Sequence, residues 1–187
     1  MTSKRRGSGV TFVEVLMVLV ILGILLAVAA PSLADMLNRR RVQAIAEQIS
    51  TDLAFARAET ALRPLNAVRL IFRNGSDQSC YTVSYFDTSP RCNCLNTGDA
   101  CMSATTEFKT ERIPKSVGVS FASSAPTGST APSGTVSFET PQLTASPQGF
   151  SVTVSGVRGA QLKLELNAAG RVRTCTPNGS FSGVPPC

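Results

Sequence analysis

The chain of 187 residues contains no histidine and no tryptophan. Histidine is the commonest general base and the commonest metal ligand, and without it no Ser/His/Asp catalytic set can form. The phosphate-cradling patterns Gly-x-Gly-x-x-Gly and the P-loop are missing as well. No motif positions a Ser/Lys pair. We therefore expect a protein that is not an enzyme and that needs neither a cofactor nor a metal ion.

Charged residues are also few, at 16% of the chain, and the formal net charge is +6. Lys4, Arg5 and Arg6 supply half of that excess, and all three precede the first long apolar run. If this leading segment is removed, the rest of the protein is only mildly basic. Charge alone therefore gives no reason to expect a nucleic-acid partner.

What the sequence does have is an apolar run from Val10 to Pro31, long enough for a membrane-spanning helix. A carboxylate, Glu14, interrupts this run, although a lone charge in lipid is costly. An ordinary signal peptide cleaved after Ala29 would explain the basic start and the apolar stretch. Glu14, the length of the run and the helical pattern beyond Ala29 all oppose that interpretation.

The helical pattern continues from Ser32 to about Arg63, with apolar residues at three- and four-residue spacings. The predicted apolar face consists of Leu33, Leu37, Ile45, Ile49, Leu53, Ala56 and Leu62. Pro31 is expected to kink the helix and Pro64 to close it. The arginine triplet 39–41 lies either at the lipid headgroup boundary or on a solvated face. We expect residues 10–31 to be a transmembrane segment and residues 32–64 an amphipathic second half of the same helix.

Residues 65–187 have the pattern of a β-rich globular domain. Alternating or β-branched stretches predict short strands near 66–75, 79–86, 118–123, 135–139, 150–156, 160–167 and 171–175. Hairpin turns are predicted at 157–159 and 167–170. The Ser- and Pro-rich stretches 122–136 and 140–149 are predicted to be long surface loops. Together with the helix, these strands predict an α+β fold in which the second half of the helix packs on antiparallel sheets.

Six cysteines indicate an oxidising compartment and disulfide bonds. They are Cys80, Cys92, Cys94, Cys101, Cys175 and Cys187. A zinc site at Cys92, Cys94 and Cys101 is the weaker interpretation, because there is no histidine and the spacing is not a paired C-x-x-C.

The segment Gly9-Val10-Thr11-Phe12-Val13-Glu14 resembles the prepilin peptidase site of type IV pilins and type II secretion pseudopilins. The resemblance implies cleavage after Gly9, N-methylation of Val10, and Glu14 at the usual acidic position of the mature chain. Val10 departs from the more usual Phe or Met. When subunits stack, the new amine of one subunit would neutralise Glu14 of a neighbour, so that Glu14 sets the axial register of assembly. The alternative is a carboxylate that stays hydrated at the membrane interface.

A second, narrower resemblance is to the FimT/GspH group of minor pilins and pseudopilins. The stretches 51–72 (TDLAFARAETALRPLNAVRLIF) and 167–175 (NAAGRVRTC) carry it, and the middle of the chain matches poorly. The resemblance implies a disulfide between Cys175 and Cys187 that closes the C-terminal loop. Cys92 and Cys94 would then each bond to Cys80 or Cys101, in a pairing that the sequence leaves open.

Two arginines near the C-terminus form a candidate DNA site. In a strand, Arg171 and Arg173 would share one face while Val172 packs inward. The FimT-type Gly-Arg-x-Arg motif is associated with capture of DNA, and Gly170, Arg171 and Arg173 match it. Arg158 and Lys163 are expected to extend this patch. The alternative is that these are ordinary exposed charges, or partners for acids on a neighbouring pilin.

The resemblances together imply a minor pilin of a type IV pilus, with residues 1–9 removed as a leader. The subunit would cross the bacterial inner membrane once, hold its C-terminal domain in the periplasm, and then enter the filament. Its partners would be other pilins or pseudopilins through the helix, the prepilin peptidase/N-methyltransferase, and the inner-membrane assembly platform. Two alternatives stay open: a GspH-like pseudopilin of type II secretion, and a pilus-associated receptor for double-stranded DNA.

Overall fold

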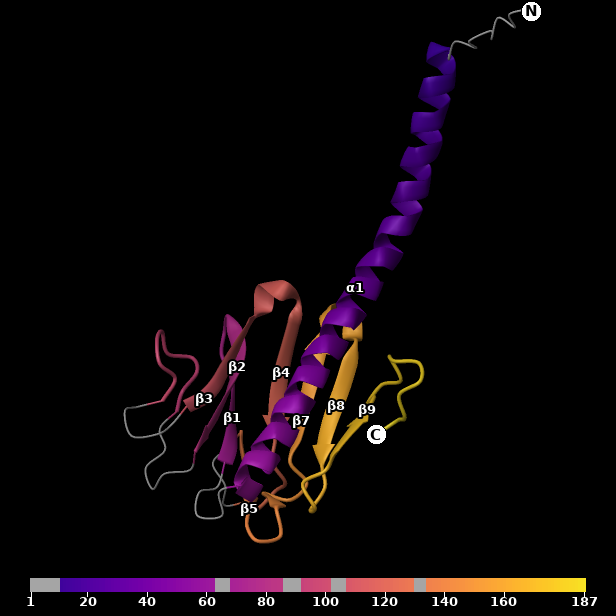
Figure 1. Cartoon of the computed structure of the whole chain (residues 1–187). Helices are drawn as coiled ribbons and strands as arrows, with labels where there is room; N and C mark the ends of the chain where they lie inside the picture. Colours follow the sequence, from indigo (N-terminus) through magenta and orange to yellow (C-terminus); the bar gives the residue numbers. More distant parts are fainter. Residues whose placement is uncertain (1–10, 63–67, 86–91, 102–106, 130–133) are drawn as a thin grey trace, which may run out of the picture. The chain divides into compact units, whose positions relative to one another are not determined.

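The computed structural model describes residues 11–62, 68–85, 92–101, 107–129 and 134–187. The chain divides into two compact units, residues 1–37 and 38–187. One helix, α1 (Phe12–Leu62), belongs to both units (Figure 1). Pro31 lies inside α1 and does not end it, and the helix ends close to the predicted Arg63. Arg63 and Pro64 fall outside the described residues.

The part of α1 in the first unit is apolar and exposed. Within the residues that the structure describes, α1 is long and apolar enough to cross a membrane. Every side chain from 11 to 34 is exposed. The helix begins with a polar cap, because the Glu14 amide donates to the Thr11 hydroxyl oxygen at 3.3 Å. Apolar surface of this extent requires lipid or other protein chains to cover it.

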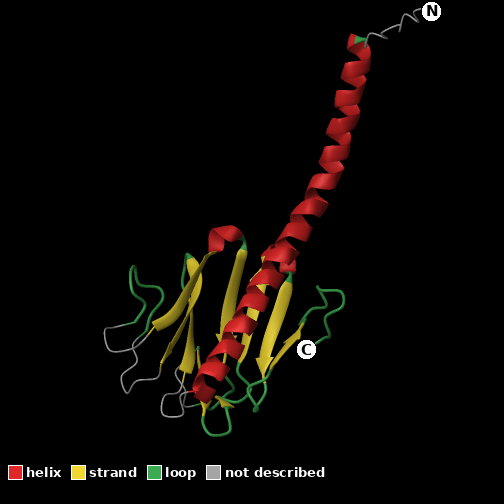
Figure 2. Ribbon diagram, viewed as in Figure 1, coloured by secondary structure: helices red, strands yellow, loops and turns green. Residues whose placement is uncertain are grey.

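The second unit contains two antiparallel sheets and the last part of α1 (Figure 2). The first sheet has the order β3-β2-β1-β5-β6, formed by β1 (Val68–Asn74), β2 (Gln78–Tyr85), β3 (Glu107–Pro114), β5 (Thr135–Glu139) and β6 (Thr144–Ser146). The second has the order β4-β7-β8-β9, formed by β4 (Val119–Ser124), β7 (Ser151–Gly156), β8 (Gln161–Leu166) and β9 (Val172–Cys175). Two short 3-10 turns, η1 (Lys115–Val117) and η2 (Val157–Gly159), connect β3 to β4 and β7 to β8. The architecture is the expected α+β, pilin-like one.

The predicted helix face is confirmed at its centre, where Ile49, Leu53 and Ala56 are buried, and wrong at its two ends. The buried apolar positions of α1 are Val42, Ala46, Ile49, Leu53 and Ala56, spaced alternately by four and three residues. Leu33, Leu37 and Leu62, which were expected on that face, are exposed. The difference arises because Leu33 and Leu37 belong to the first unit, whereas alanines at 46 and 56 let the sheets approach the helix closely.

The helix and both sheets share one hydrophobic core. At its centre the Phe72 ring of β1 lies 5.4 Å from Tyr81 of β2, 6.0 Å from Phe121 of β4 and 5.7 Å from Phe150, measured between ring centroids. A backbone hydrogen bond of 3.2 Å from Ala145 to Ala168 also joins β6 to the β8–β9 turn. The two sheets therefore form a single folding unit with residues 38–62 of the helix.

Two strands were not predicted. β3 is rich in charged residues, and it pairs with β2 along its length because its charges find partners on neighbouring elements. β6 lies in the stretch 140–149, which was expected to be a surface loop, yet Ala145 is buried in the core. A strand of three residues is too short to give a periodic pattern.

Candidate functional site

The first candidate site is the start of α1. Gly9 and Val10, the expected cleavage and methylation positions, lie outside the described residues. Glu14 stands in the first turn of the helix, exposed, beside the exposed side chains of Phe12 and Val13. A carboxylate near a helix N-terminus is favoured by the helix dipole. The arrangement offers one anion within an otherwise apolar surface, which is suited to meeting one cation of a neighbouring chain.

The second candidate site is the β8–β9 hairpin, whose turn is fixed by hydrogen bonds from and to Asn167. The Arg171 amide donates to the Asn167 side-chain oxygen at 2.9 Å, and the Gly170 amide donates to the Asn167 carbonyl, also at 2.9 Å. Gly170 has a φ of +68°, and a Cβ there would lie 3.0 Å from the Leu143 carbonyl oxygen and from the Phe138 ring. Glycine at 170 is therefore required by the fold, whatever the adjacent arginines bind.

Arg171 and Arg173 are both exposed, and Val172 between them packs partly buried against the core. The Arg173 guanidinium donates weakly to the Pro186 carbonyl at 3.4 Å. Arg173 also stands opposite Glu165 in the β8–β9 register. An acid next to the patch reduces the local positive potential that a phosphate backbone would meet.

The two residues expected to extend this patch lie in less favourable places. Lys163 forms an ion pair with Glu165 at 2.8 Å, so its charge is already compensated. Arg158 lies in η2, before β8 begins, whereas Arg171 follows the end of β8. Arg158 and Arg171 therefore stand at opposite ends of that strand, and Arg158 does not extend the patch.

All six cysteines are in disulfide bonds: Cys80 with Cys94, Cys92 with Cys101, and Cys175 with Cys187. The thiols of the zinc interpretation are thus oxidised and offer no thiolate to a metal. The Cys80–Cys94 bond attaches the segment 92–101 to the outer face of the first sheet, and the Cys92–Cys101 bond joins the two ends of that segment. Arg112 of β3 holds this segment as well, donating to the carbonyls of Cys94 and Gly98 at 2.9 and 2.7 Å.

Sequence reasoning missed a polar cluster between α1 and the first sheet. The buried Asp52 carboxylate accepts a short hydrogen bond from the Tyr81 hydroxyl and an ion pair of 3.0 Å from Lys109. Burial, together with the hydrogen bond to Asp52, raises the pKa of Tyr81 well above its usual range. Partial burial lowers the pKa of Lys109, but its hydrogen bonds to Asp52 and Glu111 outweigh this effect and raise it overall. The sequence signal that could have revealed this cluster is Asp52, an acidic residue on the apolar face of the helix.

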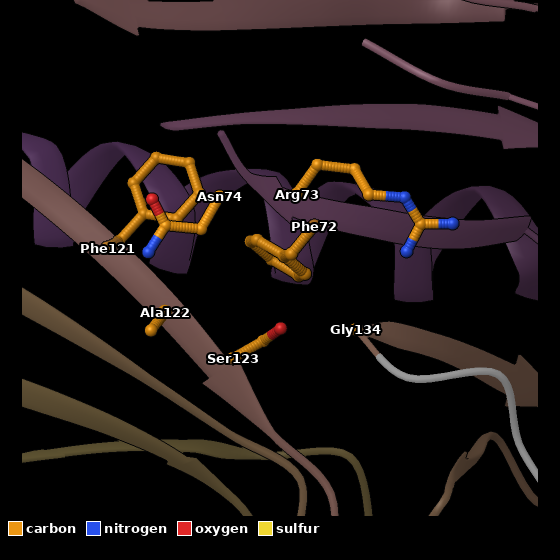
Figure 3. Close-up of a pocket in the computed structure, with 7 residues that line it drawn as sticks. All are labelled: Phe72, Arg73, Asn74, Phe121, Ala122, Ser123 and Gly134. Carbon is orange, nitrogen blue, oxygen red and sulfur yellow. The ribbon is translucent and has the colours of Figure 1, made fainter. Parts of the chain in front are cut away.

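A cavity of about 220 Å³ is lined mainly by residues of β1 and β4 (Figure 3). Its lining residues are Phe72, Arg73, Asn74, Phe121, Ala122, Ser123 and Gly134. Arg73 is the one ionisable residue among those that line it, so the cavity holds no acid and base pair.

One family model matches the chain: the prokaryotic N-terminal methylation motif, over residues 4–30. No curated protein and no solved structure shows significant similarity to the chain. The matched motif is of the prepilin type, and it runs directly into the exposed apolar part of α1. The motif, this helix and the antiparallel sheets behind it together support a structural subunit of the type IV pilin-like or pseudopilin-like class.

Proposed function

We propose that this chain is a minor pilin of the FimT/GspH type, cleaved by a prepilin peptidase after Gly9 and N-methylated on Val10. The subunit then assembles into a type IV pilus or primes its assembly. The observation that carries the proposal is the exposed apolar helix that follows the methylation motif. At about 25 cal/mol per Å² of apolar area, such a surface is stable only in lipid or among other such helices.

Glu14 gives this assembly its register. Alone in lipid, its carboxylate is strongly disfavoured, whereas the amine of a cleaved neighbour would neutralise it. A buried ion pair adds little net stability, but an unmatched buried charge is heavily penalised. Subunits displaced along the filament axis would leave Glu14 unmatched. The carboxylate therefore selects one axial offset between neighbouring helices.

Localisation follows from the same elements. The unassembled subunit crosses the inner membrane once, through the first part of α1, and the basic leader stays in the cytoplasm with the peptidase. The domain from residue 38 lies in the periplasm, where its three disulfides can form. An inner-membrane assembly platform then lifts the subunit out of the membrane into the filament.

Processing is tested by Gly9→Ala in a strain that has the prepilin peptidase. The wild-type chain is expected to shorten by its leader, and both the Gly9→Ala chain and the wild type in a peptidase-deficient strain are expected to stay full length. Shortening at residue 9 without the peptidase would overturn the proposal.

Register is tested separately with Glu14→Gln, which keeps the shape of the side chain and removes its charge. This variant is expected to be cleaved normally and to be lost from sheared filaments. Asp35→Asn, which removes one acid from the same helix beyond the apolar run, serves as the matched control and should still assemble. Equal incorporation of both variants would refute the role of Glu14.

The same features also suit a GspH-like pseudopilin of a type II secretion system. Deletion of the gene separates the two cases. Loss of surface pili and of twitching, with normal release of exoproteins, supports the pilus. Loss of exoprotein release with normal pili supports secretion instead.

A DNA receptor is the second candidate function, and the joint exposure of Arg171 and Arg173 favours it. Two parallel guanidinium groups suit phosphate oxygens. The test is binding of double-stranded DNA by the full chain in detergent at several salt concentrations. If both arginines contact phosphates, Arg171→Ala with Arg173→Ala should lower the log–log salt slope by about two. An unchanged affinity and slope would exclude this function.

A further inference from the structure

The end of the second unit at which α1 enters carries an unusual concentration of cations and exposed valines. We call it the helix-exit face, and it consists of Arg39, Arg40, Arg41, Lys115, Val117, Val157 and Arg158. The three arginines come from α1, Lys115 and Val117 from η1, and Val157 and Arg158 from η2.

Hydrogen bonds hold the two 3-10 turns against this part of the helix. The Asn38 side chain donates to the Val157 carbonyl at 2.6 Å, and the Arg41 guanidinium donates to the Val117 carbonyl at 3.0 Å. The Val157 amide donates to the Gly118 carbonyl at 3.1 Å, which joins one turn to the other. The helix-exit face is therefore one ordered surface within the second unit.

The close approach of these elements depends on Gly156. A Cβ at this position would lie 2.6 Å from the Val42 side chain and 2.7 Å from the Asn38 side-chain oxygen. Because no larger residue fits there, η2 is held directly on α1. The exposed Val157 and Arg158 are consequently carried at a fixed place next to the arginine triplet.

Val117 and Val157 are 38% and 52% exposed, although each lies next to a chain segment that is well packed. Lys115 precedes Val117 by two residues, and Arg158 follows Val157 directly. Exposed apolar side chains in a turn, flanked by Lys and Arg, suit a surface that has an apolar interior and an anionic outer layer. The headgroup region of a membrane that contains anionic lipid is such a surface.

The opposite end of the second unit has a different charge pattern. The last turns of α1 carry Arg57 and Glu59, the end of β5 carries Glu139, and the β8–β9 turn is followed by Arg171. These described residues include two acids and two bases. Two acids lie near the helix-exit face, against its five cations: Asp35, four residues before Arg39 on α1, and Asp77, whose backbone carbonyl accepts from the Lys115 amide at 2.8 Å.

We propose that the helix-exit face docks on anionic phospholipid headgroups of the membrane that holds the apolar part of α1. This inference rests on the membrane anchoring in the proposed function. Two observations select lipid as the occupant: the five cations, and the direct continuity of Asn38 with a helix segment whose side chains from 11 to 34 are all exposed. Docking would hold the periplasmic domain against the membrane until assembly extracts the subunit.

The absence of tryptophan from the chain allows single-tryptophan reporters. Val157→Trp reports the helix-exit face, Leu62→Trp the opposite end of α1, and Leu22→Trp the apolar segment. Each full-length variant is reconstituted in vesicles of brominated phosphatidylcholine, with or without phosphatidylglycerol. We expect Leu22→Trp to be quenched in both. The fluorescence of Val157→Trp should be blue-shifted and quenched much more strongly when phosphatidylglycerol is present. The fluorescence of Leu62→Trp should be quenched in neither kind of vesicle.

Charge variants in the Val157→Trp background measure the electrostatic part. Lys115→Gln with Arg158→Gln should lower the ratio of docked to undocked domain about fivefold per charge on anionic vesicles, or about 25-fold together. Ala54→Glu with Ala169→Glu changes the net charge by the same amount at exposed positions away from the helix-exit face and should have little effect. High salt should reduce docking in the parent variant.

Two results would overturn the inference, and they are distinguishable. If Leu22→Trp is quenched but Val157→Trp is insensitive to phosphatidylglycerol or to the Lys115 and Arg158 substitutions, docking is wrong and membrane anchoring stands. If Leu22→Trp is not quenched in either vesicle, the anchoring itself is wrong and the docking proposal fails with it.

Discussion

The Asp52 cluster provides a quantitative prediction for the attachment of α1 to the first sheet. Replacing Asp52 by alanine leaves the Tyr81 hydroxyl buried without its acceptor, which costs about 1–3 kcal/mol. Lys109 loses an ion pair, but its side chain is 37% exposed and regains water, so this loss adds only about 0–1 kcal/mol. We therefore expect Asp52→Ala to lower the free energy of unfolding by about 1–4 kcal/mol.

The assay is urea unfolding of the oxidised full chain in detergent, followed by circular dichroism. Tyr81→Phe removes the hydroxyl and keeps the ring, and it should cost about 1 kcal/mol. The two substitutions should not be additive, because the second removes a group that the first has already left unpaired. If Asp52→Ala costs less than Tyr81→Phe, or if their effects simply add, the cluster does not work as described.

Three further predictions concern the second unit. Because the pKa of Tyr81 is raised in the folded state, its hydroxyl stabilises the fold below the unfolded pKa of 10.0, and this contribution is lost as pH rises further. The difference in unfolding free energy between wild type and Tyr81→Phe, measured by urea titration, should therefore narrow above that pH. A difference that widens would contradict the assignment. Gly170→Ala should lower the free energy of unfolding by at least about 1–2 kcal/mol, because φ is +68° and a Cβ meets Leu143 and Phe138; unchanged stability in the same titration would show that the turn is not held as described. Removing the Cys175–Cys187 bond, whose partners are 12 residues apart, by the double serine variant should cost about 3 kcal/mol in thermal unfolding, and a melting temperature unaffected by the change would contradict this.

Periodicity and composition predicted the large features of this fold well, because those features rest on long patterns. The apolar run and the helix that continues past Pro31 were both expected, and so was the exposure of Arg171 and Arg173 on either side of Val172. Each of these follows from residue spacing along a single element, which a sequence shows directly.

What sequence reasoning missed depends on contacts between elements. β3 is stable because Lys109 reaches Asp52 and Arg112 reaches the segment 92–101, and neither pairing is visible in a local pattern. The extent of the buried helix face depends on which residues the sheets cover, so Leu33 and Leu37 could not be separated from Ile49 by hydropathy alone. The separation of Arg158 from Arg171, by contrast, already followed from the predicted strand at 160–167, which has one residue before its start and the other after its end.

The central claim is that the chain is processed as a prepilin, and the mature N-terminus measured by mass spectrometry tests it most directly. The account predicts that the chain isolated from cells with the peptidase begins at Val10 and carries an N-methyl group on its α-amine. A chain that begins at Ala30, after an ordinary signal-peptide cut at Ala29, would contradict it, as would an uncleaved chain in those cells.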